Sequence, residues 1–218
     1  MALARLFPGL STASKIFLIP LCQKICNATA VSYFSSVENA SCEEPLHPEV
    51  LQNLNCQINE EYQAFYTYLS MACYFGRSSI ELPGCRKFFL KQVREEEEHA
   101  TLLIDYANCR GGIVELQDIR APKVIDWCSP LNALQNALEL EMSVTKKLKQ
   151  LHQVGDKHND YHLCDFIDGT FLTQQVKSEH ELRKLITVMK RLGDSGIGIH
   201  LFDLYNYCKN DAFKLDED

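Results

Sequence analysis

The sequence lacks several features that would place it in other classes of protein. No stretch of about 20 uninterrupted apolar residues occurs among the 218, so the sequence predicts no membrane span. The 29 acidic side chains outnumber the 22 basic ones, which excludes wholesale nucleic-acid binding because that needs a basic face. The 10 cysteines are too few and too scattered for a disulfide scaffold, and those after residue 37 show no Cys-x-x-Cys spacing. No repeat and no strand pattern alternating with helices is found, which argues against an α/β fold.

Acidic residues are missing altogether from residues 1–37. This segment carries three basic side chains and seven serines or threonines, whereas residues 38–218 hold 19 basic and 29 acidic side chains. A basic, serine-rich and acid-free N-terminus is typical of a targeting segment. A mitochondrial transit peptide is favoured, and a secretory signal with the apolar stretch Ile16–Cys22 is the alternative. If the segment is no targeting signal, we expect a cytoplasmic protein. Residues 38–47 are expected to form a linker.

From residue 48 onward, apolar residues recur at helical spacing in four long runs. Pro48, Pro83 and Pro130 mark their beginnings, because proline fits the first turn of a helix. Glycines at 76, 111–112 and 193 mark their ends. The predicted helices cover about 48–75, 83–111, 130–157 and 161–193, with a short fifth helix over 197–208.

The lengths and connections of these runs predict a bundle. Helices of this length span roughly 42–50 Å, far more than the average globular helix of about 11–12 residues. The first and third connections are short, whereas residues 112–128 form a connection long enough to travel the whole bundle. The sequence therefore predicts an all-α fold over residues 48–208, a four-helix bundle with one long crossover connection and a short fifth C-terminal helix. An acidic tail over 209–218 follows.

Polar side chains interrupt the apolar stripe of each long helix near its middle. Isolated carboxylates are costly to bury unless they are paired or bind a metal, and these stripes offer no basic partner. Glutamate and histidine at i and i+3 lie on one helix face, which suits two ligands of one metal site. Carboxylates with one imidazole favour iron or manganese, and leave zinc or magnesium open. The residues concerned are Glu61 and Tyr68 in the first run, Glu96 and His99 in the second, Glu141 in the third and Gln175 in the fourth.

Five segments together resemble the ferritin family, and the resemblance covers about residues 48–208. They are INEEYQAFYTYLSM (58–71), REEEEHA (94–100), LNALQNALELE (131–141), HLCDFID (162–168) and LTQQVKS (172–178). The likeness is to the heavy, ferroxidase-active subunit, because each ferroxidase ligand that light-type subunits lack has a counterpart here. The resemblance implies a two-iron site with the ligands Glu61, Glu96, His99 and Glu141, where Glu96 bridges the two metals. Tyr68 and Gln175 would either be weak ligands or lie next to the ligands, where they would direct oxygen and bind water.

The implied site is lopsided, because the fourth run offers Gln175-x-x-Ser178 where a symmetric di-iron bundle repeats Glu-x-x-His. A weakly held second iron fits an enzyme that oxidises Fe(II) with oxygen or peroxide and passes Fe(III) on to a stored mineral. Two alternatives from other classes remain. One is a non-catalytic cage subunit or secreted iron carrier that depends on a partner chain, and the other is a soluble di-metal oxidase that never mineralises.

The resemblance further implies a hollow shell of 24 subunits, built from this chain alone or with other ferritin subunits. Asp165 and Asp168, with His152 nearby, would line three-fold iron channels, although two acids near a helix start also complement the helix dipole. Glu95 and Glu98 would face the cavity and nucleate mineral, or simply form a solvated face. Gly169 within the fourth helix and the altered segment before Pro48 depart from the family pattern.

Overall fold

The computed structural model describes residues 45–212. The targeting segment expected over 1–37, most of the linker and the end of the acidic tail lie outside the described residues. The described part is helical and contains no strand. No helix in it is long and apolar enough to cross a membrane. The elements in chain order are α2 (Pro48–Phe75), α3 (Pro83–Cys109), α4 (Pro130–Lys157), α5 (Tyr161–Phe166), the π-helical η2 (Ile167–Leu172), α6 (Thr173–Leu192) and α7 (Gly196–Ala212).

The helices begin where proline and capping residues predict. Three of the long helices have proline in the first turn. The Ser129 side chain accepts a hydrogen bond from the backbone N–H of Asn132 at 3.2 Å, which satisfies one of the free donors at the start of α4. The His47 side chain caps α2 in the same way, since its Nδ1 accepts a hydrogen bond from the backbone N–H of Glu49 at 3.2 Å. At the other end, Gly193 follows α6 with a φ of 84°, a conformation that favours glycine.

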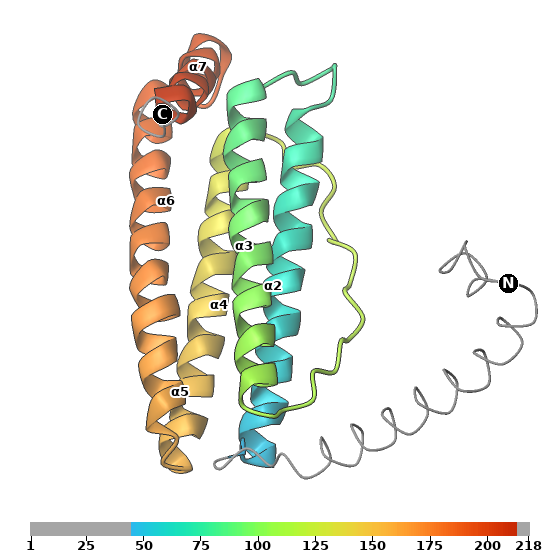
Figure 1. The fold of residues 1–218 in the computed structure, drawn as a ribbon. Coiled ribbons are helices and arrows are strands. Elements are labelled where there is room, and N and C mark those ends of the chain that lie inside the picture. Colours follow the sequence, from blue (N-terminus) through green and yellow to red (C-terminus); the bar gives the residue numbers. More distant parts are fainter. Residues whose placement is uncertain (1–44, 213–218) are drawn as a thin grey trace, which may run out of the picture. The chain divides into compact units, whose positions relative to one another are not determined.

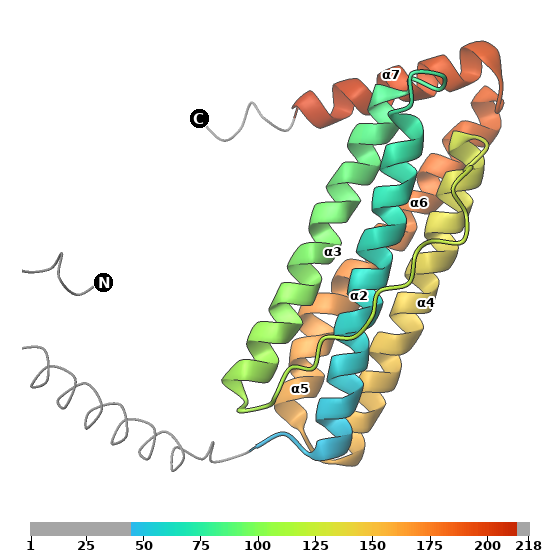
Figure 2. The ribbon, with the colours of Figure 1, turned by 90° about the vertical axis from the view of Figure 1, so that its right-hand side faces the viewer.

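α2 pairs with α3, and α4 pairs with the long helix made of α5, η2 and α6 (Figure 1). The connection from α3 to α4 runs along the whole length of α2 without regular structure, as Figure 2 shows. Amide side chains of α2 hold it in place. The Asn55 side chain donates to the carbonyl of Ile113 and accepts from the N–H of Glu115, and the Gln63 side chain makes the same two bonds with the backbone of Arg120. The predicted four-helix bundle with one long crossover is thus confirmed.

The fourth long helix differs from the prediction of one continuous α-helix. Leu163, Ile167 and Phe171 are buried, and the buried Gln175 follows four residues later. With 3.6 residues per turn, a four-residue step in an α-helix turns a side chain about 40° past a full circle. The π-helical turn η2 takes in one additional residue and compensates for this drift. It thereby keeps Phe171 and Gln175 on the inward side.

α7 crosses the end of the bundle, close to the beginning of α3 (Figures 1 and 2). It extends to Ala212 and therefore includes four residues that were expected to belong to the tail. The carboxylate of Asp203 accepts from the backbone N–H of Cys85 at 2.8 Å, at the first turn of α3. A Cβ at Gly84 would lie 1.9 Å from the carbonyl oxygen of Asp203, so only glycine allows this approach. These contacts fix α7 on the bundle.

The interior consists of two apolar clusters with a polar layer between them. One contains Tyr68, Phe75 and Phe89, and the other contains Leu54 and Leu148. On α3, α4 and the fourth long helix the polar residue lies between the stretches that supply the two clusters, whereas Glu61 of α2 lies between Ile58 and Ala64 of the second cluster. On the inward face of α2, Ala64, Tyr68 and Met71 are fully buried, whereas Phe65 and Leu69 beside them are only partly buried. The polar layer comprises Glu61, Glu96, His99, Glu141 and Gln175.

Candidate metal centre

Glu61 enters the polar layer from α2, with a side chain that is 0% exposed. Its Oε1 accepts a hydrogen bond of 2.8 Å from Nε2 of Gln57, which is itself buried one turn earlier. Gln57 was not among the site residues predicted from the sequence. Its i, i+4 spacing from Glu61 was the available signal, because residues four apart share a helix face. Gln57 orients one oxygen of Glu61 and leaves the other directed into the layer.

Glu96 and His99 come from α3, one helical turn apart, as the Glu-x-x-His spacing predicts. The His99 Nδ1 and the Glu96 Oε2 are 3.3 Å apart. One ligand atom from each of Glu61, Glu96 and His99 lies within 4.8 Å of the other two, and all three residues are buried. The ring of Phe171, which η2 turns inward, packs beside the His99 imidazole at 5.5 Å between centroids. Side chains of two helices thus converge in a geometry that would suit a single metal ion.

Glu141 reaches the layer from α4 and is held by two donors. The Tyr68 hydroxyl donates to its Oε1, and the Gln175 Nε2 donates to its Oε2 at 2.9 Å. Tyr68 comes from α2 and Gln175 from α6, so one carboxylate connects three helices. Glu141 lies outside the group of three residues around Glu61, and it has amide and hydroxyl neighbours in place of an imidazole. The hydrogen bonds to Glu141 thus come from a hydroxyl and an amide, and the lopsided two-iron site expected from Gln175-x-x-Ser178 stays a prediction.

The electrostatics of the layer disfavour a metal-free charged state. Burial, followed by repulsion from Glu96, raises the pKa of Glu61 well above its usual value. Burial and the Glu141 carboxylate do the same to the pKa of Glu96. Burial also raises the pKa of Glu141, against the opposing hydrogen bonds from Tyr68 and Gln175. Within residues 45–208 no lysine or arginine side chain is buried, so none of these carboxylates has a buried cation as partner.

Two buried atoms of the layer have no hydrogen-bond partner, namely Oε2 of Glu61 and Nε2 of His99. Buried polar atoms are nearly always satisfied, so each such atom calls for a physical explanation. A metal ion would satisfy these groups and neutralise the surrounding carboxylates. The donor set of carboxylate oxygens with one imidazole is the set that iron accepts. The residues present therefore fit an iron-binding centre.

The remaining predicted site residues lie outside the polar layer. His152 and Asp168 are paired, with 3.2 Å between Nε2 and Oδ2, and both are accessible. Asp165 is exposed on α5. Glu95 accepts from Gln92 at 2.7 Å and pairs with Lys91 at 3.0 Å, in a cavity of about 190 Å³ between α3 and α6 that Ser178 also lines. Glu98 is exposed.

Comparison with known proteins agrees with this fold. The family model described as a ferritin-like domain matches residues 51–192. The chain is 44% identical to "Ferritin-1 heavy chain" of Schistosoma mansoni over 162 residues, which cover 74% of this chain and 93% of the relative. It is 46% identical to "Soma ferritin" of Lymnaea stagnalis over 157 residues, or 72% of this chain and 90% of the relative.

A helical bundle with one long crossover and an interior layer of carboxylates defines the class of ferritin-like carboxylate proteins. Within that class, the chain belongs to the ferritin family, the iron-storage proteins.

Proposed function

We propose that the protein is a ferroxidase that oxidises Fe(II) within its own bundle and passes Fe(III) to a mineral inside a hollow shell. The observation that carries this proposal is the polar layer. Three buried glutamates and one buried histidine have no buried cationic partner in the described chain, and two of their atoms have no hydrogen-bond partner. The name of the S. mansoni relative, a ferritin heavy chain, supports the same conclusion.

In this proposal Glu61, Glu96 and His99 bind one substrate Fe(II), and Glu96 and Glu141 bind the second. Anionic ligands in a low-dielectric layer stabilise Fe(III) more than Fe(II), because the ion of higher charge interacts more strongly with them. Two Fe(II) ions release two electrons. These reduce O2 with two protons to H2O2, or reduce H2O2 with two protons to two water molecules.

Tyr68 and Gln175 have a positioning role. The Tyr68 hydroxyl and the Gln175 amide donate to the two oxygens of Glu141 and thereby fix the direction in which that carboxylate presents its lone pairs. Because only Glu96 and Glu141 would hold the second iron, that ion is the more easily released. Easy release suits an enzyme whose product leaves for a mineral.

His152, Asp165 and Asp168 would line the three-fold channels of a shell of 24 subunits and draw Fe(II) inward. The pairing of His152 with Asp168 supports a common location for these two groups. Glu95 and Glu98 would receive Fe(III) on the cavity side. The engagement of Glu95 by Lys91 and Gln92 makes it the less available of the two.

The test is the initial rate of aerobic Fe(II) oxidation by the purified assembly. The double variant Glu61→Ala, His99→Ala removes two of the three converging ligands, and we expect its rate to fall at least about tenfold. Glu97→Gln is the matched control, since it removes an exposed carboxylate from the same helix. Equal rates in the wild type and the double variant would favour the alternative, a non-catalytic cage subunit dependent on a partner chain. Particle size in the same preparation tests the shell, because a monomer or dimer contradicts it.

A further inference from the structure

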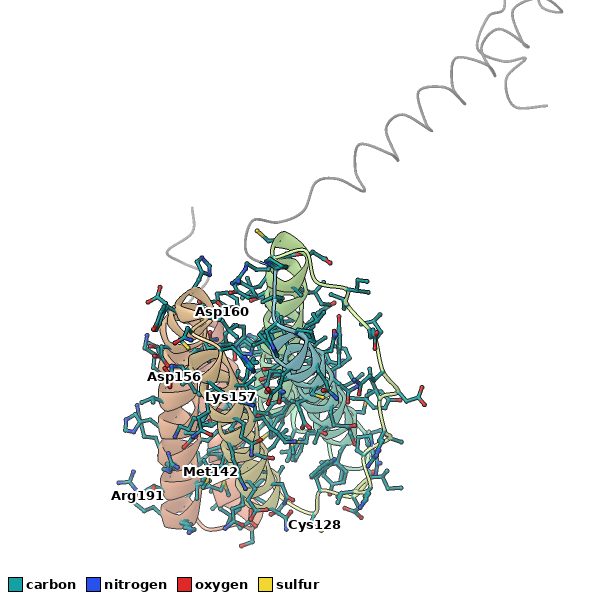
Figure 3. All side chains as sticks on the ribbon, turned by 90° about the horizontal axis from the view of Figure 1, so that it is seen from below. Cys128, Met142, Asp156, Lys157, Asp160 and Arg191 are labelled. Atoms are coloured by element: carbon teal, nitrogen blue, oxygen red, sulfur yellow. The ribbon has the colours of Figure 1, made fainter. Side chains whose placement is uncertain are left out.

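A second group of histidine and glutamate side chains lies at the end of the bundle, where α2 begins and α4 ends. We call His47, Glu49 and His158 the end cluster. One ligand atom from each of the three lies within 4.8 Å of the other two. His47 is exposed, whereas Glu49 and His158 are intermediate. Figure 3 looks onto this end of the molecule, where the labelled Lys157 lies on α4.

The contacts of the end cluster tie two helices together. The Nε2 of His158, the residue that follows α4, is 2.7 Å from Oε2 of Glu49 in the first turn of α2. The rings of His47 and His158 are stacked, with 3.6 Å between centroids and 17° between planes. Hydrogen bonds from Lys157 and His158 lower the pKa of Glu49 to about 2, so its carboxylate is charged at neutral pH.

We propose that the end cluster is a binding site for a divalent transition metal ion of the Zn²⁺ class. Two imidazoles and one carboxylate form a donor set that Zn²⁺ accepts, with water completing the coordination. The site is separate from the polar layer, because it shares none of its residues. It lies at the junction of α2 with α4, so a bound ion would link these two helices directly.

Binding requires two local changes. The stacked rings cannot both direct a lone pair at one ion, so the His47 ring turns about its Cβ–Cγ bond, a broad torsion in an exposed side chain. This turn gives up the bond that His47 accepts from the backbone N–H of Glu49. The ion also displaces the Lys157 ammonium, which lies 2.7 Å from Oε2 of Glu49. Lys157 is therefore a competitor of the metal.

This competition distinguishes a metal site from a simple cap of charged residues. If the cluster binds Zn²⁺, Lys157→Gln removes both the repulsion and the competing partner. Affinity should then increase about 30-fold, as expected for the repulsion between one unit charge and a doubly charged ion about 4 Å apart in water. A cluster that served only to join the helices would lose an ion pair in this variant and show no gain in Zn²⁺ affinity.

The direct experiment is anomalous diffraction at the zinc edge from crystals of the wild-type full chain soaked in Zn²⁺. We expect a peak within bonding distance of His158 and Glu49. A peak confined to the polar layer and the Asp165–Asp168 region, with none at the end cluster, would overturn the proposal. This measurement needs no variant, so it does not depend on how a substitution affects folding.

Calorimetric titration with Zn²⁺ in solution completes the test. His158→Gln should bind one ion fewer per chain than the wild type, or bind it at least about tenfold more weakly. His180→Gln is the matched control, because His180 is exposed on α6 away from the cluster. Equal stoichiometry and affinity in His158→Gln and the wild type contradict the site, as does a Lys157→Gln variant that binds no more tightly.

Discussion

Two clusters of the molecule bring histidine and glutamate together, and they differ in burial and in neighbouring charge. Glu61, Glu96 and His99 are buried, and no buried lysine or arginine lies among the described residues around them. The end cluster is accessible, and Lys157 already neutralises its glutamate. The difference shows that similar donor sets have different metal-free states. The charged state of the buried cluster is unfavourable until an ion enters. The carboxylate of the end cluster already has an ion-pair partner, which a metal ion has to displace.

The largest difference between the clusters should appear in Fe(II) oxidation. Glu96→Ala removes the carboxylate that stands between the two proposed iron positions. We expect the initial rate to fall about 100-fold, because a ligand contributes at least as much as the supporting residues around it. Glu49→Gln, in the end cluster, should leave the rate unchanged. The measurement is aerobic oxidation under identical iron loading, and a large loss in Glu49→Gln would show that the end cluster takes part in oxidation.

The stability of the metal-free protein should reveal the cost of the buried charges. Because burial holds the pKa of Glu61 well above 4.5, its contribution to folding is present below about pH 4.5 and is lost as the pH rises through the folded-state value. The side chain introduced by Glu61→Gln cannot ionise, so the variant does not lose this stability as the pH rises. We expect the variant to be more stable than the wild type by about 1–4 kcal/mol at pH 8, with a smaller gain at pH 6. Chemical denaturation of chelator-treated protein at both pH values checks this, and a gain that shrinks with rising pH would contradict it.

Gln57 should matter for metal binding more than for folding. Gln57→Leu removes the hydrogen-bond donor to Oε1 of Glu61. It fills the same buried position with an apolar side chain of similar size. We expect iron affinity at the buried site to weaken about tenfold, because residues that orient ligands typically contribute this much. Titration with Fe(II) under anaerobic conditions measures the effect. Gln174→Leu, next to Gln175 but only partly buried, is the control.

The smallest effect should come from breaking the end cluster in the absence of metal. Glu49→Gln removes an accessible ion pair with Lys157, and exposed ion pairs contribute little to stability. The thermal midpoint should stay within measurement error of the wild type. In Zn²⁺ the wild type should gain thermal stability relative to Glu49→Gln, because a ligand that binds only the folded state stabilises it. An equal gain in both proteins would place the ion elsewhere.

Much of the fold followed from local signals in the sequence. Pro48, Pro83 and Pro130 gave the helix beginnings, and the long glycine-bounded runs with one long connection gave the bundle. The phase of Glu61, Glu96, Glu141 and Gln175 placed them in the interior because a helix with a fixed period has few ways to bury its apolar side.

Other features of the fold and of the sites could not be predicted, because the helical periodicity of one segment does not contain them. The π-helical turn η2 was not predicted, although the four-residue spacing of the buried Leu163, Ile167 and Phe171 is the sequence feature that indicates it. The end cluster joins residues that are more than 100 positions apart, from His47 to His158, and only the antiparallel arrangement of the helices brings them together. Whether Asp165 and Glu98 line a channel and a cavity depends on neighbouring subunits, and stays a prediction.

The π-helical turn also divides the fourth long helix into two halves, and its length sets the rotation of one half relative to the other about the helix axis. Gaining or losing one residue within Ile167–Leu172 would rotate everything after it by about 100° relative to α5. The length of η2 therefore sets the orientation of the half that carries Gln175 relative to the half that carries Asp165. The number of residues in η2, more than their identity, determines which side chains of α6 face the interior. Gly169 fits this view, since a Cβ there would meet no atom within 4 Å.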